Sequence, residues 1–276
     1  MVFVVGAVAI DLVAVREKFL DGTSNPSDIR LGLGGVGYRI FSNLDAPRKF
    51  ITALAADPIS RWAREALQAD GSVAIQNVRA KDARPPLYLA LMESGSLKVA
   101  ASDFRILEQS LSLSFAVEQI GAAGPRDFLV LDANLSAPVL KGLCARYTGS
   151  ARVVFEPVSV EKATRHAETL HDLFLLTPTS EEMAALSEGS AQEYRRSRRI
   201  ANLLVTMGHE GAKLYDDIGE ETFAPSTVVD APDTTGAGDL LLASLISRLH
   251  AGKPMRTAVR SAMQGVEQRL SAGDPL

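Results

Sequence analysis

Residues 233–239 combine carboxylates, hydroxyls and glycines in a spacing that suits phosphate chemistry. They read Asp-Thr-Thr-Gly-Ala-Gly-Asp, and an apolar stretch at 240–249, predicted to be a helix, follows them. Gly236 and Gly238 let the backbone approach a bulky anion and turn N–H groups toward it, while the helix adds the positive end of its dipole. Asp239 would lie beside that anion, where a carboxylate makes chemical sense if it takes a proton from an attacking hydroxyl. A glycine-rich loop with an ordinary Asp N-cap is the structural alternative, and the complete string favours the functional one.

The composition excludes several classes of protein. The chain has 276 residues, of which 46% are hydrophobic and 22% charged, with a formal net charge of −4. This length suits one large α/β domain or two small ones, and the mildly acidic balance argues against a nucleic-acid or membrane surface. Cys144 is the single cysteine, which excludes an intramolecular disulfide and favours a reduced, cytoplasmic setting. We expect the basic run 195–199 to form a solvated helix face and the four histidines to lie at the surface.

The apolar pattern predicts a mostly parallel sheet with helices on both of its faces, within one domain over 1–276. The predicted strands are 2–5, 50–54, 128–132, 153–156, 173–176 and 203–207. The predicted helices are 37–44, 60–69, 137–147, 160–170, 180–185, 193–199, 239–249 and 255–270. Two stretches, about 12–33 and 84–101, carry turn residues between short strand-like runs. We expect them to form a small β lid across the mouth of the main sheet.

Acids and hydroxyls follow most of the predicted strands. They are Asp11, Asp57, Asp132 with Asn134, Glu156, Thr177 with Glu182, and Thr206 with Gly208. Ligands of open parallel sheets bind beyond the carboxyl ends of the strands, so these residues sample the predicted site. Each alone is more often a helix cap than a ligand. Together they suit a polyol and a magnesium-bound phosphate better than an apolar ligand.

With these residues the chain resembles the PfkB (ribokinase-like) carbohydrate kinase family from end to end. The family's C-terminal signature corresponds to 233–239, and its glycine turn into a helix corresponds to Gly34-Gly35. Thr177-Pro178 with Glu182 resembles its TPNxxE segment, and 205–208 with Gly211 resembles its TLGxxG nucleotide segment. The segments 23–26, 34–37, 101–104, 131–136 and 155–159 are similar to the pseudouridine kinase branch.

The resemblance implies a three-layer α/β/α kinase that transfers phosphate from ATP to the primary hydroxyl of a ribosyl substrate, giving pseudouridine 5′-phosphate from pseudouridine. Asp239 would be the general base, and the N–H groups of Gly236, Ala237 and Gly238 would stabilise the transferred phosphoryl group. The implied substrate residues are Asp11, Asn25, Gly34, Gly35 and Arg39. The implied nucleotide residues are Thr206, Gly208, Gly211 and Thr235. Glu182 and Asp233 would serve Mg²⁺, and Asp233 with Thr235 would lie near a loop for a monovalent cation such as K⁺. The lid would exclude water and pair two copies into a homodimer.

Several positions depart from the family pattern. Arg39 and Thr179 each stand where the family has an asparagine, Ala55 where it has a glycine, and Leu241 where it commonly has a phenylalanine. An arginine is larger and offers donors only, so the ribose pocket must differ. Two alternatives therefore stay open, a sugar kinase with another substrate and a catalytically impaired relative that binds nucleotide or a ribosyl ligand. A dinucleotide-binding oxidoreductase is disfavoured because Gly6 is not followed by GxGxxG.

Overall fold

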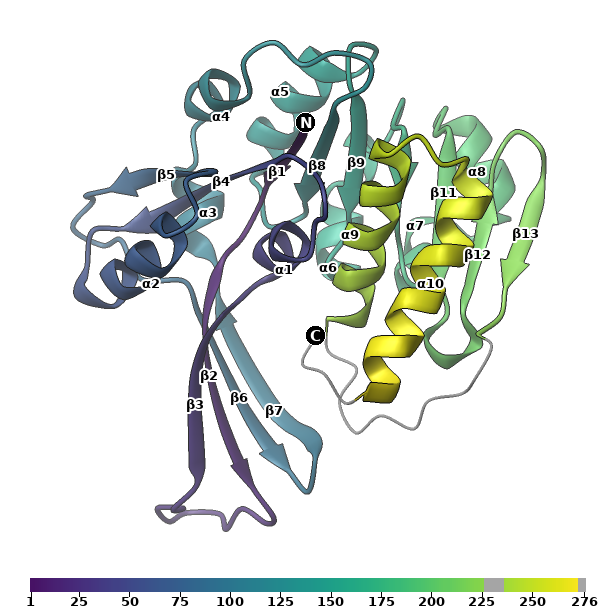
Figure 1. The fold of residues 1–276 in the computed structure, drawn as a ribbon. Coiled ribbons are helices and arrows are strands. Elements are labelled where there is room, and N and C mark those ends of the chain that lie inside the picture. Colours follow the sequence, from purple (N-terminus) through teal and green to yellow (C-terminus); the bar gives the residue numbers. More distant parts are fainter. Residues whose placement is uncertain (226–235, 273–276) are drawn as a thin grey trace.

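The computed structural model describes residues 1–225 and 236–272 and has a nine-stranded sheet at its centre (Figure 1). The order across this sheet is β13-β12-β11-β10-β9-β8-β1-β4-β5. Neighbouring strands are parallel except that β12 is antiparallel to both β11 and β13. The strands are β1 Val2–Val5, β4 Arg48–Ala55, β5 Val73–Val78, β8 Phe128–Asp132, β9 Arg152–Glu156, β10 Leu175–Leu176, β11 Asn202–Thr206, β12 Ala212–Tyr215 and β13 Glu220–Phe223. The predicted parallel sheet is confirmed.

Helices cover both faces of this sheet and enclose two apolar cores. One core joins α1 Val36–Ser42, α2 Pro58–Gln68, α9 Ala237–His250 and α10 Met255–Ala272 to the sheet. The other joins α3 Arg105–Ser110, α4 Leu113–Ile120, α5 Ala137–Tyr147, α7 Ser180–Leu186 and α8 Ala191–Ser197. In β1 the side chains of Val2 and Val4 enter the first core and those of Phe3 and Val5 the second. This alternation explains why the strand is apolar at every position.

A second sheet of four strands, in the order β3-β2-β6-β7, projects from the main body (Figure 1). Its strands are β2 Ala9–Arg16, β3 Asp28–Gly34, β6 Leu87–Glu93 and β7 Ser96–Asp103. The turn between β6 and β7 places Ser94 and Gly95 at positive φ, 50° and 83°, which is the geometry of a tight hairpin. The two segments predicted to form a lid thus pair into one sheet.

The main sheet reverses its direction of growth at β1. From β1 the chain goes outward to β4 and β5, then returns to β8 on the other side of β1 and continues toward β13. Such a switch point leaves a crevice beyond the carboxyl ends of the two central strands, where ligands of α/β sheets bind. Gly6 and Ala7 follow β1, Asp132 is the last residue of β8, and β2 begins here as well.

Some expectations were wrong or incomplete. The strand expected at 173–176 covers only Leu175–Leu176, and the helix expected at 160–170 is α6 Val160–Arg165 followed by the short 3-10 turn η1 Ala167–Thr169. Arg195 is buried rather than solvated, since it donates to the carbonyl oxygens of Ile200 and Ala201 and pairs with Asp217. His166 is also buried, with Nε2 3.2 Å from the Ala133 carbonyl oxygen. No helix in the described ranges is long and apolar enough to cross a bilayer.

Candidate active site

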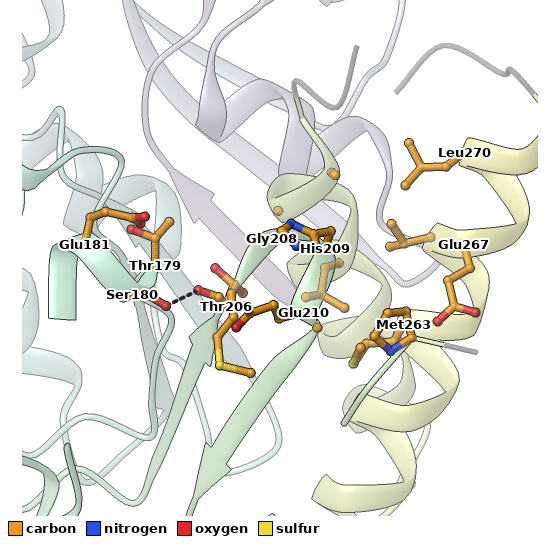
Figure 2. Close-up of a pocket in the computed structure, with 17 residues that line it drawn as sticks. Thr179, Ser180, Glu181, Thr206, Gly208, His209, Glu210, Met263, Glu267 and Leu270 are labelled. Atoms are coloured by element: carbon orange, nitrogen blue, oxygen red, sulfur yellow. Dashed lines mark hydrogen bonds between the residues drawn. The ribbon is translucent and has the colours of Figure 1, made fainter. Parts of the chain in front are cut away.

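A pocket of about 740 Å³ opens between the end of β11 and the helices α9 and α10. Figure 2 shows Met263, Glu267 and Leu270 of α10 facing the segment that contains Gly208 and His209. The remaining lining residues include Thr206, Gly211, Ala237, Gly238 and Leu241. Three of the four residues predicted to bind nucleotide, Thr206, Gly208 and Gly211, therefore lie on one pocket together with the predicted phosphate cradle. Its lining combines apolar side chains, such as Leu241 and Met263, with polar ones, such as Thr206, as small-molecule sites do.

The helix α9 begins beside this pocket, directly after the glycine that was predicted to precede it. Gly236 is its N-cap and adopts the left-handed conformation with φ 90°. Ala237 and Gly238 form the first turn and line the pocket. The free N–H groups and the positive dipole end of a helix favour an anion at this position. The start of α9 is therefore placed to hold the terminal phosphates of a nucleotide.

Gly238 allows a direct test of this cradle. A Cβ built on Gly238 meets no heavy atom of residues 1–225 or 236–272 within 4 Å, so an alanine fits among them. We expect Gly238→Ala to raise the free energy of unfolding by about 0.5–1 kcal/mol, because alanine is the better helix former. The added methyl would occupy the space of the phosphoryl group, so kcat should fall at least about tenfold. Thermal unfolding and steady-state rates measure the two effects, and an unchanged kcat would contradict the cradle.

Asp239 lies in the first turn of α9, close enough to Arg39 and Asp132 for their charges to act on its carboxyl group. Burial raises the pKa of Asp239 to about 7, the positive charge of Arg39 lowers it and the negative charge of Asp132 raises it. These partners come from α1 and from the end of β8, so the carboxylate lies between the two halves of the sheet. A carboxyl group with a pKa near neutral is suited to accept a proton.

Asp11 and Arg39 form an ion pair beside Asp239. Arg39 Nη2 donates to Asp11 Oδ2 at 3.1 Å, and both side chains are largely buried. The other carboxylate oxygen, Oδ1, is buried without a hydrogen-bond partner among the described residues. A Cβ at Gly34 would lie 1.9 Å from Asp11 Oδ2, so the carboxylate occupies space that only a glycine leaves open. The structure thus brings together Asp11, Gly34, Arg39 and Asp239, as predicted.

Asp132 joins the segments that form this crevice. Its Oδ2 accepts hydrogen bonds from the N–H groups of Ala7 at 2.7 Å and Gly37 at 3.1 Å, and its Oδ1 accepts one from Asn134 at 2.9 Å. The side chain is fully buried, and burial raises its pKa. Asp132 therefore holds the segment after β1 and the start of α1 in place relative to β8. This role is structural, and it positions the residues predicted to bind the substrate.

Two further carboxylates lie in this region, Glu156 at the end of β9 and Glu182 in the first turn of α7. Thr177 Oγ1 donates to Glu156 Oε2 at 2.6 Å, and burial raises the pKa of Glu156 well above its usual range, with the charges of Asp239 and Glu182 acting in the same direction. Glu182 Oε2 accepts from the Thr179 N–H at 2.8 Å in a capping box that starts α7. Thr179, one of the departures from the family pattern, thus serves as a helix cap. No cluster of three or more His, Cys, Asp or Glu side chains in 1–225 and 236–272 is arranged to hold a metal by itself.

Lys162 is a residue of this region to which the sequence reasoning gave no role. Its Nζ donates to Asn134 Oδ1 at 2.6 Å and lies 5.3 Å from the centre of the Phe104 ring. Burial lowers its pKa, which the nearby Asp132 charge opposes. The contact joins α6 to the segment after β8, two stretches far apart in the sequence, so no local signal points to it.

Other predicted residues lie elsewhere or outside the described ranges. Asn25 is in the loop between β2 and β3, where its side chain accepts from Arg16 and Leu20 N and donates to the carbonyl oxygens of Leu20 and Thr23. The structure does not bring it to the crevice. Asp57 is the N-cap of α2, accepting from the N–H groups of Ile59 and Ser60, so its position after a strand reflects capping. Asp233 and Thr235 lie outside the described residues.

The chain is similar to known proteins. The family model described as pfkB family carbohydrate kinase matches residues 1–264. The pseudouridine kinase of Escherichia coli (strain K12) is 23% identical over 98% of this chain and 90% of its own, and the guanosine-inosine kinase of Exiguobacterium acetylicum is 26% identical over 95% and 91%. The structure of Arabidopsis thaliana ribokinase complexed with ribose and ATP superposes with a TM-score of 0.73 at 18% identity, covering 96% of this chain and 90% of that one.

The ribokinase-like fold predicted from the sequence is therefore confirmed, and the predicted phosphotransferase class with it. With the family model matched over nearly the whole length and the cradle and carboxylate in place at the start of α9, the chain belongs to the pfkB family of carbohydrate kinases.

Proposed function

We propose that this protein transfers the γ-phosphoryl group of ATP to the primary hydroxyl of a ribosyl substrate, with pseudouridine as the preferred acceptor. The observation that carries the proposal is Asp239, a carboxyl group with a pKa of about 7 at the helix N-terminus that opens on the pocket. The similarity to a pseudouridine kinase and a guanosine-inosine kinase supports a nucleoside as the acceptor.

The geometry supports in-line transfer. The acceptor's hydroxyl oxygen attacks the γ-phosphorus as the bond to the bridging oxygen of ADP breaks, and the hydroxyl proton passes to an Asp239 carboxylate oxygen. The N–H groups of Gly236, Ala237 and Gly238 at the start of α9 would stabilise the charge on the transferred group. Asp11 and Arg39 would orient the acceptor. The four-stranded lid would close over it and exclude water, which would otherwise consume ATP.

The acidic residues at the ends of β9 and β10 fit a magnesium ion that arrives with the nucleotide. Burial raises the pKa of both Glu156 and Glu182, and the charge of Glu182 raises the pKa of Glu156 further. Mg²⁺ keeps several waters and needs only one or two carboxylates besides the phosphates, so these two side chains would hold it through water. The ion would neutralise charge on the phosphates. A role for Asp233 with Mg²⁺ and for Thr235 near K⁺ stays a prediction.

The pH dependence of the reaction tests the role of Asp239. A general base acts when deprotonated, and the pKa of Asp239 is raised to about 7. The rate should therefore rise about tenfold per pH unit below pH 7 and level off above it. Measuring kcat/KM for pseudouridine from pH 5 to 9 at saturating ATP and Mg²⁺ checks this. A rate that is flat through pH 7 would count against Asp239 as the base.

Arg39 and Thr179 favour a second candidate, a relative that binds nucleotide or a ribosyl ligand without turnover. Arg39 fills part of the acceptor crevice, and Thr179 is occupied as a helix cap. A panel of pseudouridine, other nucleosides and simple sugars, with ADP release as the readout and thermal shift in parallel, separates the possibilities. Release of ADP with a sugar but not a nucleoside indicates a different sugar kinase. Stabilisation by ligands without ADP release indicates the binding protein.

A homodimer through the lid is part of the proposal. On the lid face opposite Asp11, the side chains of Ile29, Leu31, Leu89 and Val99 lie across three strands and are about half exposed or more. An apolar sheet face of this kind is commonly covered by a partner. Light scattering gives the mass, and a monomer at micromolar concentration would remove this part of the proposal.

A further inference from the structure

The segment between β9 and α6 contains a strained backbone turn. The Ser159 N–H donates to the Pro157 carbonyl oxygen at 2.7 Å, and Val158 between them has φ 68°. These two features define a γ-turn with a positive φ at its centre, which is the rarer and more strained of the two γ-turn forms. A β-branched residue in the left-handed region is an outlier, because its Cβ crowds the following carbonyl oxygen. Strain of this kind persists only where the surrounding structure enforces it, and it is concentrated at functional sites.

Neighbouring contacts hold the turn in this conformation. The ring of Pro157 restricts the backbone on one side of the turn. On the other side Ser159 begins α6, where its side chain accepts a hydrogen bond from the Lys162 N–H. The Val158 side chain is partly buried and packs against the core that contains α5 and α7. This side chain therefore supplies packing that offsets the strain of its own backbone.

The turn directs its central N–H group toward the Glu156 carboxylate. The Val158 N–H donates to Glu156 Oε1 at 3.3 Å, and Thr177 Oγ1 donates to Oε2 at 2.6 Å, so each carboxylate oxygen has a donor. The negative charges of Asp239 and Glu182 act on this carboxylate and favour its rotation away from them. The two donors, which come from different elements, oppose that rotation.

We propose that Val158 is a positioning residue: its strained turn, together with Thr177, holds the Glu156 carboxylate in one orientation for the magnesium ion that arrives with ATP. This inference rests on the proposed function, because it concerns the metal of the same reaction. A carboxylate has about four acceptor positions, so some remain for the water molecules of the ion after the two donors have bonded. Mg²⁺ demands near-octahedral geometry, and a carboxylate that is already fixed loses less conformational freedom on binding.

Nucleotide binding without an acceptor tests this role independently of turnover. The quantity measured is the magnesium gain, defined as the Kd of ATP in EDTA divided by the Kd of ATP in saturating Mg²⁺, both from calorimetry. Val158→Ala keeps the strained backbone but removes most of the packing that holds the turn, so we expect the magnesium gain to fall about three- to tenfold. The Kd in EDTA should hold, because Val158 is not among the residues that line the nucleotide's pocket.

Val158→Gly separates the conformation of the turn from its packing. Glycine adopts a positive φ without strain, so this variant should retain more of the magnesium gain than Val158→Ala. It should also unfold at a temperature about 2 °C or more above that of Val158→Ala. This order of stability is the reverse of the one found within helices and strands, where glycine is the less stable of the two.

Arg199 provides the matched control for strain alone. Its φ is 52°, and its exposed side chain pairs with Asp172. Arg199→Gly should again be more stable than Arg199→Ala, but neither variant should change the magnesium gain. Thr177→Val removes the other donor to Glu156 while keeping the shape of the side chain, so it should lower the gain as Val158→Ala does.

The Glu156→Gln variant shows whether Val158 acts through this carboxylate. Glu156→Gln should itself lower the magnesium gain, and adding Val158→Ala should lower it further by no more than about twofold. A full additional loss in the double variant would mean that Val158 acts by another route and would overturn the inference.

The single variants can overturn it as well. An unchanged gain in Val158→Ala or Thr177→Val, a smaller gain in Val158→Gly than in Val158→Ala, or an equal loss in Arg199→Ala would each do so. If the magnesium gains follow the expected order but no acceptor causes release of ADP, the proposed kinase reaction is removed and the role of Val158 is left intact. The two proposals therefore fail in different experiments.

Discussion

Asp239→Asn is expected to lower the rate of phosphoryl transfer about 10²- to 10⁴-fold while leaving nucleotide affinity nearly unchanged. The amide keeps the size of the side chain but cannot accept the hydroxyl proton. The pocket proposed for the nucleotide is lined by the segment 206–211 and by residues of α7, α9 and α10. Asp239 is not among the lining residues, so nucleotide affinity should hold. The rise of the rate with pH through 7 should also vanish, because its origin is the Asp239 carboxyl group.

The stability of this variant provides an internal check on folding. The pKa of Asp239 is raised in the folded protein above the usual aspartate value, so its ionisation destabilises the fold as pH rises through 7. An amide does not ionise, and Asp239→Asn should therefore be at least as stable as the wild type at pH 8. Asp57→Asn is the matched control, since Asp57 also follows a strand but caps α2, and asparagine caps equally well. Normal turnover in Asp239→Asn would disprove the assigned role.

Features encoded in short stretches of sequence were predictable. The start of α9 follows from local rules, because Gly236 takes the left-handed conformation and an apolar helix comes next. The strand Phe128–Asp132 was predicted with its observed bounds, because a short fully apolar run ending in an acid is typical of a buried parallel strand. The Glu93-Ser94-Gly95 turn of the lid likewise follows from residue types.

Features that depend on contacts between distant segments were not predictable. The Asp11–Arg39 pair joins β2 to α1, and Asp132 joins β8 to Ala7 and Gly37. An aspartate after a strand reads the same in the sequence whether it caps a helix, as Asp57 does, or fixes two segments, as Asp132 does. The strands β12 and β13 were not predicted. In β13, charged residues dominate and only Phe223 is buried, so this strand lacks a clear apolar pattern. In these cases tertiary packing determined the role of the residue or the conformation of the segment.

Gly34 and Gly35 form a pair whose alanine variants should fail in different ways. Gly35 is the N-cap of α1 with φ 88°, and a Cβ there would lie 2.8 Å from the Ala9 nitrogen and 2.9 Å from the Ala7 carbonyl oxygen. Both contacts are with backbone that cannot move aside, and the conformation itself is strained for alanine. We expect Gly35→Ala to lower the free energy of unfolding by about 3–5 kcal/mol, measured by denaturant unfolding.

Gly34→Ala should instead spare the fold and damage the site. Its Cβ would meet the Asp11 carboxylate, 1.9 Å from Oδ2, and a side chain can turn away where backbone cannot. Turning away breaks the ion pair with Arg39 and removes Oδ1 from the crevice, so acceptor affinity should fall about tenfold or more while nucleotide affinity holds. Calorimetry with each ligand and denaturant unfolding of both variants measure the contrast. Undiminished acceptor affinity in Gly34→Ala would show that Asp11 does not hold the acceptor, and equal losses of stability in the two variants would contradict the predicted contrast.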